Sequence, residues 1–256
     1  MRVPSFKSSP ASSAMVVLSL AASGWAGGAL GCKKSEPLPS LRVAAAADLR
    51  PLLTELAPLY EQKNHVHVEL VFGASGTLAK QIAEGAPYDV FASASEGFVD
   101  EVVHSGACDA ATRARFAEGQ LALVIPAKGA AATLDDLADP SVRRIAIAQP
   151  QHAPYGQAAK EALVAKKLWA VVEPRLVYAD NVGHAHTLVK DGHVDAALVA
   201  ASLAPEAPRL PVSLHAPLRQ AAVACGKGDP ARKQAFIAYL AGPEGQALLL
   251  RHAFRP

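Results

Sequence analysis

The sequence has little net charge, few cysteines and no long apolar run, and each shortage excludes a class of protein. Its 25 Lys and Arg residues nearly balance 23 Asp and Glu residues, so it lacks the basic surface that nucleic acid requires. Its three cysteines and nine histidines show no zinc-site spacing, and we expect no metal held by side chains. With 51 % apolar and 19 % charged residues, the chain is globular rather than disordered.

The N-terminus has the pattern of a targeting segment. Two basic residues precede a short apolar run over residues 14–22, which is too short to cross a bilayer and is typical of a signal peptide. Ala29-Leu30-Gly31-Cys32 then resembles a bacterial lipoprotein cleavage site, although such sites usually have Leu at the position of Ala29. We expect residues 1–31 to be removed, Cys32 to be lipidated and residues 32–40 to form a linker. Plain secretory cleavage is the alternative, and both routes place the protein in the periplasm.

Two cysteines remain if Cys32 carries lipid. Cys108 and Cys225 could pair in an oxidising compartment, or they could be two small buried hydrophobic residues. They are far apart in the sequence, and no local pattern fixes their distance. We expect them to be unpaired.

A strand that turns directly into a helix at Ser75 is the most informative segment. Apolar residues alternate over 66–72, which predicts a strand, and they recur at helical spacing from Thr77 onward. The first N–H groups of that helix have no partner within the helix. These donors, the Ser75 hydroxyl and the positive end of the helix dipole suit an anion. We expect one side of an oxyanion-binding cleft here, with an ordinary capped turn as the alternative.

Strands and helices alternate along the rest of the chain, which predicts an α/β fold with parallel strands. The elements divide into two lobes of similar size. We expect lobe 1 to contain residues 41–123 and 216–256, and lobe 2 to contain residues 124–215. The predicted strands cover residues 41–46, 66–72, 89–92, 121–126, 144–148, 176–178, 196–199 and 218–225. The predicted helices cover residues 49–63, 76–84, 96–104, 133–138, 154–168, 182–190, 230–241 and 243–253.

Four strand-to-helix turns are candidate ligand-binding points, because ligands in open sheets bind at the carboxyl ends of strands. Ala47-Asp48 and Ser75 belong to lobe 1, whereas Tyr155 and Asn181-Val182 belong to lobe 2. A ligand held from both sides would close the lobes by a hinge motion. We also expect Asp48 to cap the helix that begins at Leu49.

With these four turns, the chain resembles the molybdate-binding periplasmic proteins of the type II solute-binding superfamily, which serve ABC importers. The resemblance covers residues 41–256 and implies the two-lobed fold of that superfamily, with the ligand cleft between the lobes. The segments that carry it, in order, are residues 43–49, 72–82, 85–94, 148–156 and 180–182. The ending over residues 242–249 is typical of the superfamily at large.

The resemblance implies a monomeric protein without a cofactor that captures molybdate, and also tungstate, for a membrane permease of the ABC type. Ser75 would donate its hydroxyl and its N–H, and Tyr155 its N–H or its hydroxyl. Neutral dipoles of this kind can hold a dianion without Lys or Arg, at roughly 1.5–3 kcal/mol for each charge-assisted bond. The binding residues implied are Ala47, Asp48, Ser75, Tyr155, Asn181 and Val182.

Two positions depart from the family pattern and leave the anion open. Many members have Ser where this chain has Asp48, whose carboxylate would repel a dianion unless it points away or is protonated. Some members use a Tyr hydroxyl after the strand at 196–199, where this chain has Ala200 and where Tyr155 could supply the donor instead. Sulfate, another tetrahedral anion or a ferric complex is the alternative ligand.

An enzyme is the alternative from a different class. Ser75 invites comparison with the nucleophile elbow Gly-x-Ser-x-Gly, but Thr77 occupies the position of the last glycine. No histidine later in the chain carries a recognisable local signature. We therefore expect a binding protein rather than a serine hydrolase.

Overall fold

The computed structural model describes residues 38–256, which form two lobes, each built on its own sheet. The predicted signal peptide over residues 1–31, the lipidation site Cys32 and most of the predicted linker lie outside the described residues. Among the described helices, none has the length and apolar character needed to cross a membrane.

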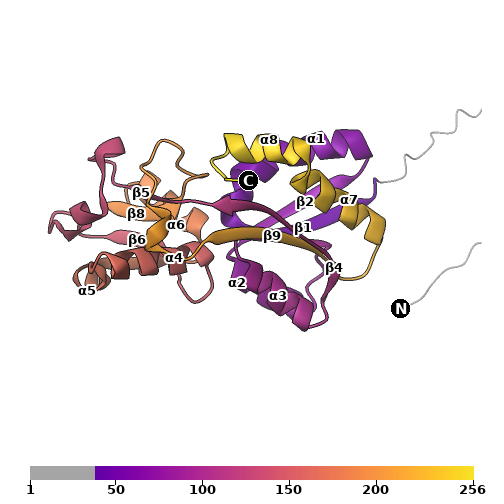
Figure 1. Ribbon diagram of the computed structural model, residues 1–256, viewed down its shortest axis with the longest axis horizontal. Coiled ribbons are helices and arrows are strands. Elements are labelled where there is room, and N and C mark those ends of the chain that lie inside the picture. The colour runs from indigo at the N-terminus through magenta and orange to yellow at the C-terminus, as the bar shows by residue number, and fades with distance from the viewer. Residues whose placement is uncertain (1–37) are drawn as a thin grey trace, which may run out of the picture. The chain divides into compact units, whose positions relative to one another are not determined.

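Lobe 1 is a five-stranded sheet in the order β2-β1-β3-β9-β4. β1 pairs in parallel with β2 and β3, whereas β9 runs antiparallel to β3 and β4. Helices α1, α7 and α8 cover one face of the sheet, and α2 and α3 cover the other (Figure 1). The strands are β1 (Ser40–Ala46), β2 (His67–Gly73), β3 (Val90–Ser93), β4 (Cys108–Gly119) and β9 (Leu218–Cys225). The helices are α1 (Arg50–Asn64), α2 (Ser75–Ala83), α3 (Glu96–His104), α7 (Pro230–Ala241) and α8 (Pro243–Arg251).

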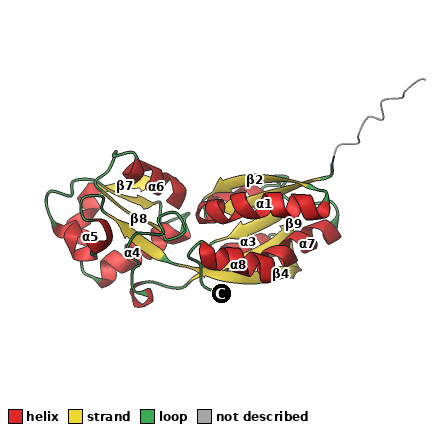
Figure 2. Ribbon diagram, turned by 90° about the horizontal axis from the view of Figure 1, so that it is seen from above, coloured by secondary structure: helices red, strands yellow, loops and turns green. Residues whose placement is uncertain are grey.

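Lobe 2 is a four-stranded sheet in the order β5-β8-β6-β7. β6 pairs in parallel with β7 and β8, and β5 runs antiparallel to β8. Helices α4 and α6 pack against this sheet, and α5 follows α4 (Figure 2). The strands are β5 (Leu121–Val124), β6 (Ile145–Ala148), β7 (Leu176–Ala179) and β8 (Ala196–Ala200). The helices are α4 (Pro154–Ala165), α5 (Trp169–Val172) and α6 (Val182–Lys190).

The chain passes between the two sheets twice. It leaves lobe 1 at Gln120, between β4 and β5, and it returns through residues 215–217 before β9. β5 pairs with β8 from Leu121 onward, so the first crossing lies three residues before the predicted boundary at residue 124. The apolar run that begins at Leu121 predicts a strand, but only its pairing partner shows which sheet it joins.

The edge strand β4 has no counterpart among the predicted elements. Its exposed residues Arg113 and Arg115 both pair with Glu96 at the start of α3, and its pairing with β9 shifts register between Asp109 and Ala114. Charged residues and bulges are typical of edge strands, because they oppose pairing with another chain. They also interrupt the alternation by which a strand is recognised in a sequence.

Cys108 and Cys225 form a disulfide, so the expectation of unpaired thiols is wrong. The two residues lie directly opposite each other in the antiparallel pairing of β4 and β9. Both belong to the apolar cluster beneath α2 and α3, which also contains Ile82 and Phe91. The bond therefore joins the first residue of β4 to the last residue of β9, its neighbour in the sheet.

Candidate ligand-binding site

The four predicted turns meet at one cavity between the two lobes. The empty space at this small cavity is about 190 Å³, open solvent included. Lobe 1 contributes the ends of β1 and β2, and lobe 2 contributes the starts of α4 and α6. The six predicted residues all line it: Ala47, Asp48, Ser75, Tyr155, Asn181 and Val182. Their contacts with a ligand remain a prediction.

Helix N-termini surround this cavity. α2 begins at Ser75, α4 at Pro154 and α6 at Val182, and a 3₁₀ helix over Ala47–Leu49 leads into α1. The first N–H groups of each helix have no partner within it and carry the positive end of its dipole. Among the described residues that line the cavity there is no Lys, Arg or His. The arrangement therefore offers neutral donors to an anion from both lobes.

Ser75 and Asn181 are each oriented by a backbone N–H group. The Ser75 hydroxyl oxygen accepts from the N–H of Ala94 at 3.1 Å, so the hydroxyl hydrogen is free to be donated to a ligand. The Asn181 side-chain oxygen accepts from the N–H of His184 at 3.0 Å and caps α6. Its amide NH₂ group remains as a donor.

Asp48 does not cap a helix, which corrects the prediction. Within residues 38–256 its side chain makes no capping hydrogen bond at the start of either helical segment. Its Oδ2 instead accepts from Nε2 of Gln220 at 2.7 Å, and its backbone carbonyl accepts from the Ser202 hydroxyl at 2.8 Å. Gln220 lies on β9, which is separated from β1 by β3 in the sheet, one residue beyond the last residue of β9 that pairs with β3.

The buried environment of Asp48 disfavours its ionised form. Burial raises the pKa of its carboxyl from 3.8 to about 6, and the Tyr155 hydroxyl and the Gln220 amide offset part of that rise. The Tyr155 hydroxyl and the Asp48 carboxyl influence each other's pKa, yet Oδ1 of Asp48 and Oη of Tyr155 both lack a hydrogen-bond partner among the described residues. Burial, and then the nearby Asp48 charge, raise the pKa of Tyr155.

Hydrogen bonds join the two lobes beside the cavity. The N–H of Gly76 in α2 donates to the carbonyl of His152 in lobe 2 at 2.8 Å, and Ser202 of lobe 2 donates to Asp48 as described. A side chain at Gly76 has no room, because its Cβ would lie 2.8 Å from the Phe98 ring and 2.9 Å from the His152 carbonyl oxygen. The structure is therefore a closed form of the cleft.

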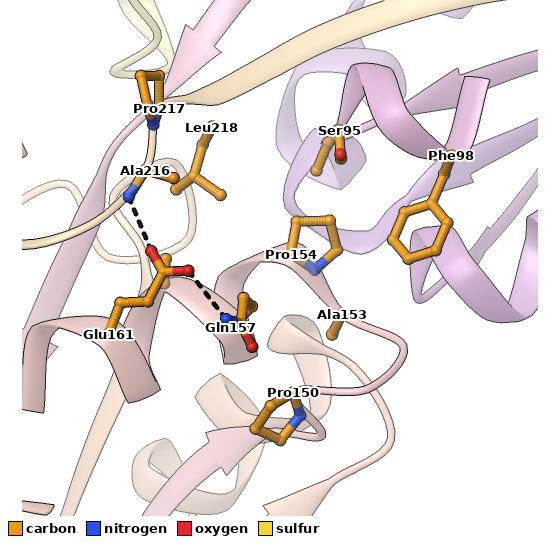
Figure 3. A pocket seen from close by; sticks show the side chains of 12 residues that line it. Ser95, Phe98, Pro150, Ala153, Pro154, Gln157, Glu161, Ala216, Pro217 and Leu218 are labelled. Atoms are coloured by element: carbon orange, nitrogen blue, oxygen red, sulfur yellow. Dashed lines mark hydrogen bonds between the residues drawn. The ribbon is translucent and has the colours of Figure 1, made fainter. Parts of the chain in front are cut away.

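A second groove adjoins the cavity on the side of the returning connection (Figure 3). It has about 600 Å³ of empty space. Glu161 of α4 accepts from the Gln157 side chain and from the N–H of Ala216, both at 2.8 Å. Because the charged residue that lines this groove is an acid already bonded to its neighbours, the groove is unsuited to an anion. Its hydrogen bonds attach the connection over residues 215–217 to α4.

Sequence reasoning missed the residues that contact the site from other elements. Two of them, Gln220 and Ser202, donate hydrogen bonds to Asp48. The third, His152, accepts a hydrogen bond from the N–H of Gly76 through its backbone carbonyl, and a backbone contact leaves no motif in the sequence. One signal was available for Gln220, because it is a polar residue inside the apolar strand over residues 218–225 and is fully buried. A polar side chain in such a position requires a buried partner.

Comparison with known proteins places the chain in a family. The family model of bacterial extracellular solute-binding proteins matches residues 41–255. The molybdate-binding protein ModA of Escherichia coli is 30 % identical, and the match covers 84 % of this chain and 88 % of ModA. ModA of Azotobacter vinelandii is 29 % identical over 84 % of this chain and 89 % of its own length.

Solved structures agree with the sequence relatives. The periplasmic molybdate-binding protein of Azotobacter vinelandii superposes with a TM-score of 0.77 at 28 % identity, covering 84 % of this chain and 99 % of that chain. The sulfate-binding protein SubI of Mycobacterium tuberculosis has a TM-score of 0.69 at 16 % identity, covering 85 % and 87 %, which shows a shared fold alone.

These matches confirm the two-lobed fold and the resemblance to molybdate-binding proteins. They also remove the serine hydrolase alternative, because the matched family consists of binding proteins rather than enzymes. Ser75 stands beside helix N-termini and has no histidine among the described residues of its cavity. The chain belongs to the family of bacterial extracellular solute-binding proteins.

Proposed function

We propose that this protein binds molybdate, and also tungstate, in the periplasm and delivers it to an ABC importer. The observation that carries the proposal is the convergence of four helix starts from two lobes on one buried cavity without cationic side chains. A small dianion matches such a site, because several neutral donors can share its charge. The ModA relatives support molybdate over the distant sulfate-binding neighbour.

The two lobes would hold the anion from opposite sides. Ser75 with the 3₁₀ helix holds the anion from lobe 1, and Tyr155 with Val182 holds it from lobe 2. Closure places these donors around the ligand and excludes water, which strengthens each charge-assisted bond. A permease would then recognise the closed form.

The test is calorimetric titration of a chain that starts at Lys33 with molybdate, tungstate, sulfate and phosphate. We expect tight binding of molybdate and tungstate, and much weaker binding of sulfate and phosphate. Binding of sulfate in preference to molybdate, or of none of the four, would contradict the proposal.

Ser75→Ala is expected to weaken molybdate binding by roughly 10- to 100-fold, because one charge-assisted hydrogen bond contributes about 1.5–3 kcal/mol. The measurement is the dissociation constant of molybdate by calorimetry. Ser93→Ala is the matched control, since Ser93 is a buried serine of the same lobe whose hydroxyl donates to the carbonyl of Ser95 and does not line the cavity. Equal affinities for the two variants would show that Ser75 does not hold the anion.

We further propose that Cys32 is acylated and tethers the protein to the membrane, where two or more acyl chains give stable anchoring. Cys32→Ser is expected to move the protein from the membrane fraction to the soluble periplasmic fraction while the molybdate affinity stays unchanged. Fractionation followed by immunoblotting measures this. A wild-type protein already found in the soluble fraction would instead indicate plain secretory cleavage.

A further inference from the structure

Asp48, Tyr155 and Gln220 form a buried polar cluster that dianion binding by itself does not explain. All three side chains are at most 2 % exposed. Asp48 and Tyr155 also line the cavity. Each has one polar atom without a partner among the described residues: Oδ1 of Asp48, Oη of Tyr155 and Oε1 of Gln220. Unpartnered buried polar atoms are unfavourable and indicate that a group is missing from the site.

A bound dianion would make an ionised Asp48 still less favourable. The carboxylate is already removed from water, and a second negative charge in the same cavity adds repulsion at low dielectric. Its Oδ2 accepts a hydrogen bond from Gln220, which is a neutral amide and supplies no compensating charge. A single proton on the carboxyl removes the repulsion and turns Oδ1 from an unpaired acceptor into a donor.

Among residues 38–256, no cation is placed to neutralise Asp48 in another way. The elements packed against its 3₁₀ helix are α1 and α6. Arg50 of α1 lies over the Phe72 ring, 4.3 Å from its centroid, and His184 of α6 pairs with the exposed Asp180. His186 of α6 lines a different pocket with Lys190. On β9, Arg219 is directed to Glu96.

We propose that the site takes up one proton with each oxyanion, and that the Asp48 carboxyl, positioned by Gln220, holds this proton. The proton comes from solvent and bonds to the free carboxylate oxygen, and no other bond is made or broken. The acid then donates toward the anion or toward the Tyr155 hydroxyl beside it. This inference rests on the proposed binding of a molybdate-like dianion.

The direction of the pH dependence depends on whether the free protein or the complex holds the proton. Burial raises the pKa of Asp48 to about 6 in the closed form without ligand, and opening the cleft reduces that burial and lowers the pKa. The free protein is therefore largely ionised above about pH 6, whereas the complex is protonated. Binding then consumes a proton, and the affinity falls as the pH rises. Below about pH 5 both states hold the proton, and the coupling disappears.

The experiment is calorimetric titration of the chain starting at Lys33 with molybdate, between about pH 6.5 and 9, in buffers of different ionisation enthalpy. We expect uptake of close to one proton per molybdate at the alkaline end, and a dissociation constant that rises about tenfold per pH unit. Asp48→Asn is expected to bind without proton uptake and with a nearly constant affinity. Asp180→Asn, which removes a solvent-exposed carboxylate next to Asn181, is the matched control and should retain the uptake.

Each outcome decides the inference. Molybdate binding by the wild-type chain without proton uptake would overturn the inference and leave the proposed function intact. Uptake that persists in Asp48→Asn would overturn the assignment to Asp48. Failure of the wild-type chain to bind any oxyanion would overturn the proposed function and this inference together. If Asp48→Asn does not fold, Asp48→Ser provides the same comparison with the residue that many family members have, and the wild-type proton count is decisive by itself.

Discussion

Gly76→Ala is expected to lower the affinity for molybdate by roughly 5- to 150-fold. The added methyl group would lie 2.9 Å from the backbone carbonyl oxygen of His152 and 2.8 Å from the Phe98 ring. The ring end can move toward the adjoining groove, but the carbonyl belongs to the opposite lobe and accepts the hydrogen bond that holds the lobes together. Overpacking of this kind costs about 1–3 kcal/mol. Because only the closed form is destabilised, and only the closed form holds the ligand, this cost corresponds to the roughly 5- to 150-fold loss of affinity.

Gly97→Ala is the matched control for this prediction. Gly97 lies in the first turn of α3, where an added Cβ would meet only the Ser95 hydroxyl at 3.5 Å, an ordinary contact. We expect its molybdate affinity to equal that of the wild type. The thermal midpoint of ligand-free Gly76→Ala should also stay close to that of the wild type, because the open form avoids the His152 carbonyl. Wild-type affinity in Gly76→Ala would show that the contact with His152 is not part of closure.

Loss of the Cys108–Cys225 disulfide is expected to lower the free energy of unfolding by about 2–4 kcal/mol. The bond joins two residues that are 117 positions apart in the sequence. The unfolded chain with the bond intact therefore has far fewer conformations than the reduced unfolded chain. The measurement is urea unfolding of the wild type with and without reductant, together with a count of free thiols. The double variant Cys108→Ala with Cys225→Ala is the control, because reductant should not change its stability.

The disulfide should have little influence on ligand affinity. Neither cysteine lines the cavity between the lobes, and both lie in the cluster beneath α2 and α3. We therefore expect reduced, folded protein to bind molybdate with unchanged affinity. A reduced protein with unchanged unfolding free energy would contradict the expected stabilisation, and a large loss of affinity would show that the disulfide positions the site.

Local sequence patterns predicted several helices and strands with the bounds that the structure shows. The bounds of α6, β9 and α7 coincide with the predicted ranges 182–190, 218–225 and 230–241, because these segments have clear periodicity and capping residues such as Asn181 and Asp229. The four turns at the carboxyl ends of strands also come together at one cavity, as expected for open α/β sheets. A turn between a strand and a helix can be predicted from the sequence because the residues directly before and after it define it.

Contacts between distant segments could not be predicted in this way. The pairing of Cys108 with Cys225 depends on the register of β4 against β9, and β4 itself is hidden by its charged residues and its bulge. The orientation of Asp48 depends on Gln220, which is 172 residues away.

The sequence by itself determined the alternating strands and helices, the family, and the residues at the four turns. The tertiary structure alone decided which cysteines bond, where the chain crosses between the sheets, and that Asp48 faces an amide and a phenol rather than capping its helix. The physical reason is that periodicity and capping depend on neighbours a few residues apart. Register, burial and pKa instead depend on which distant segments the folded chain brings into contact.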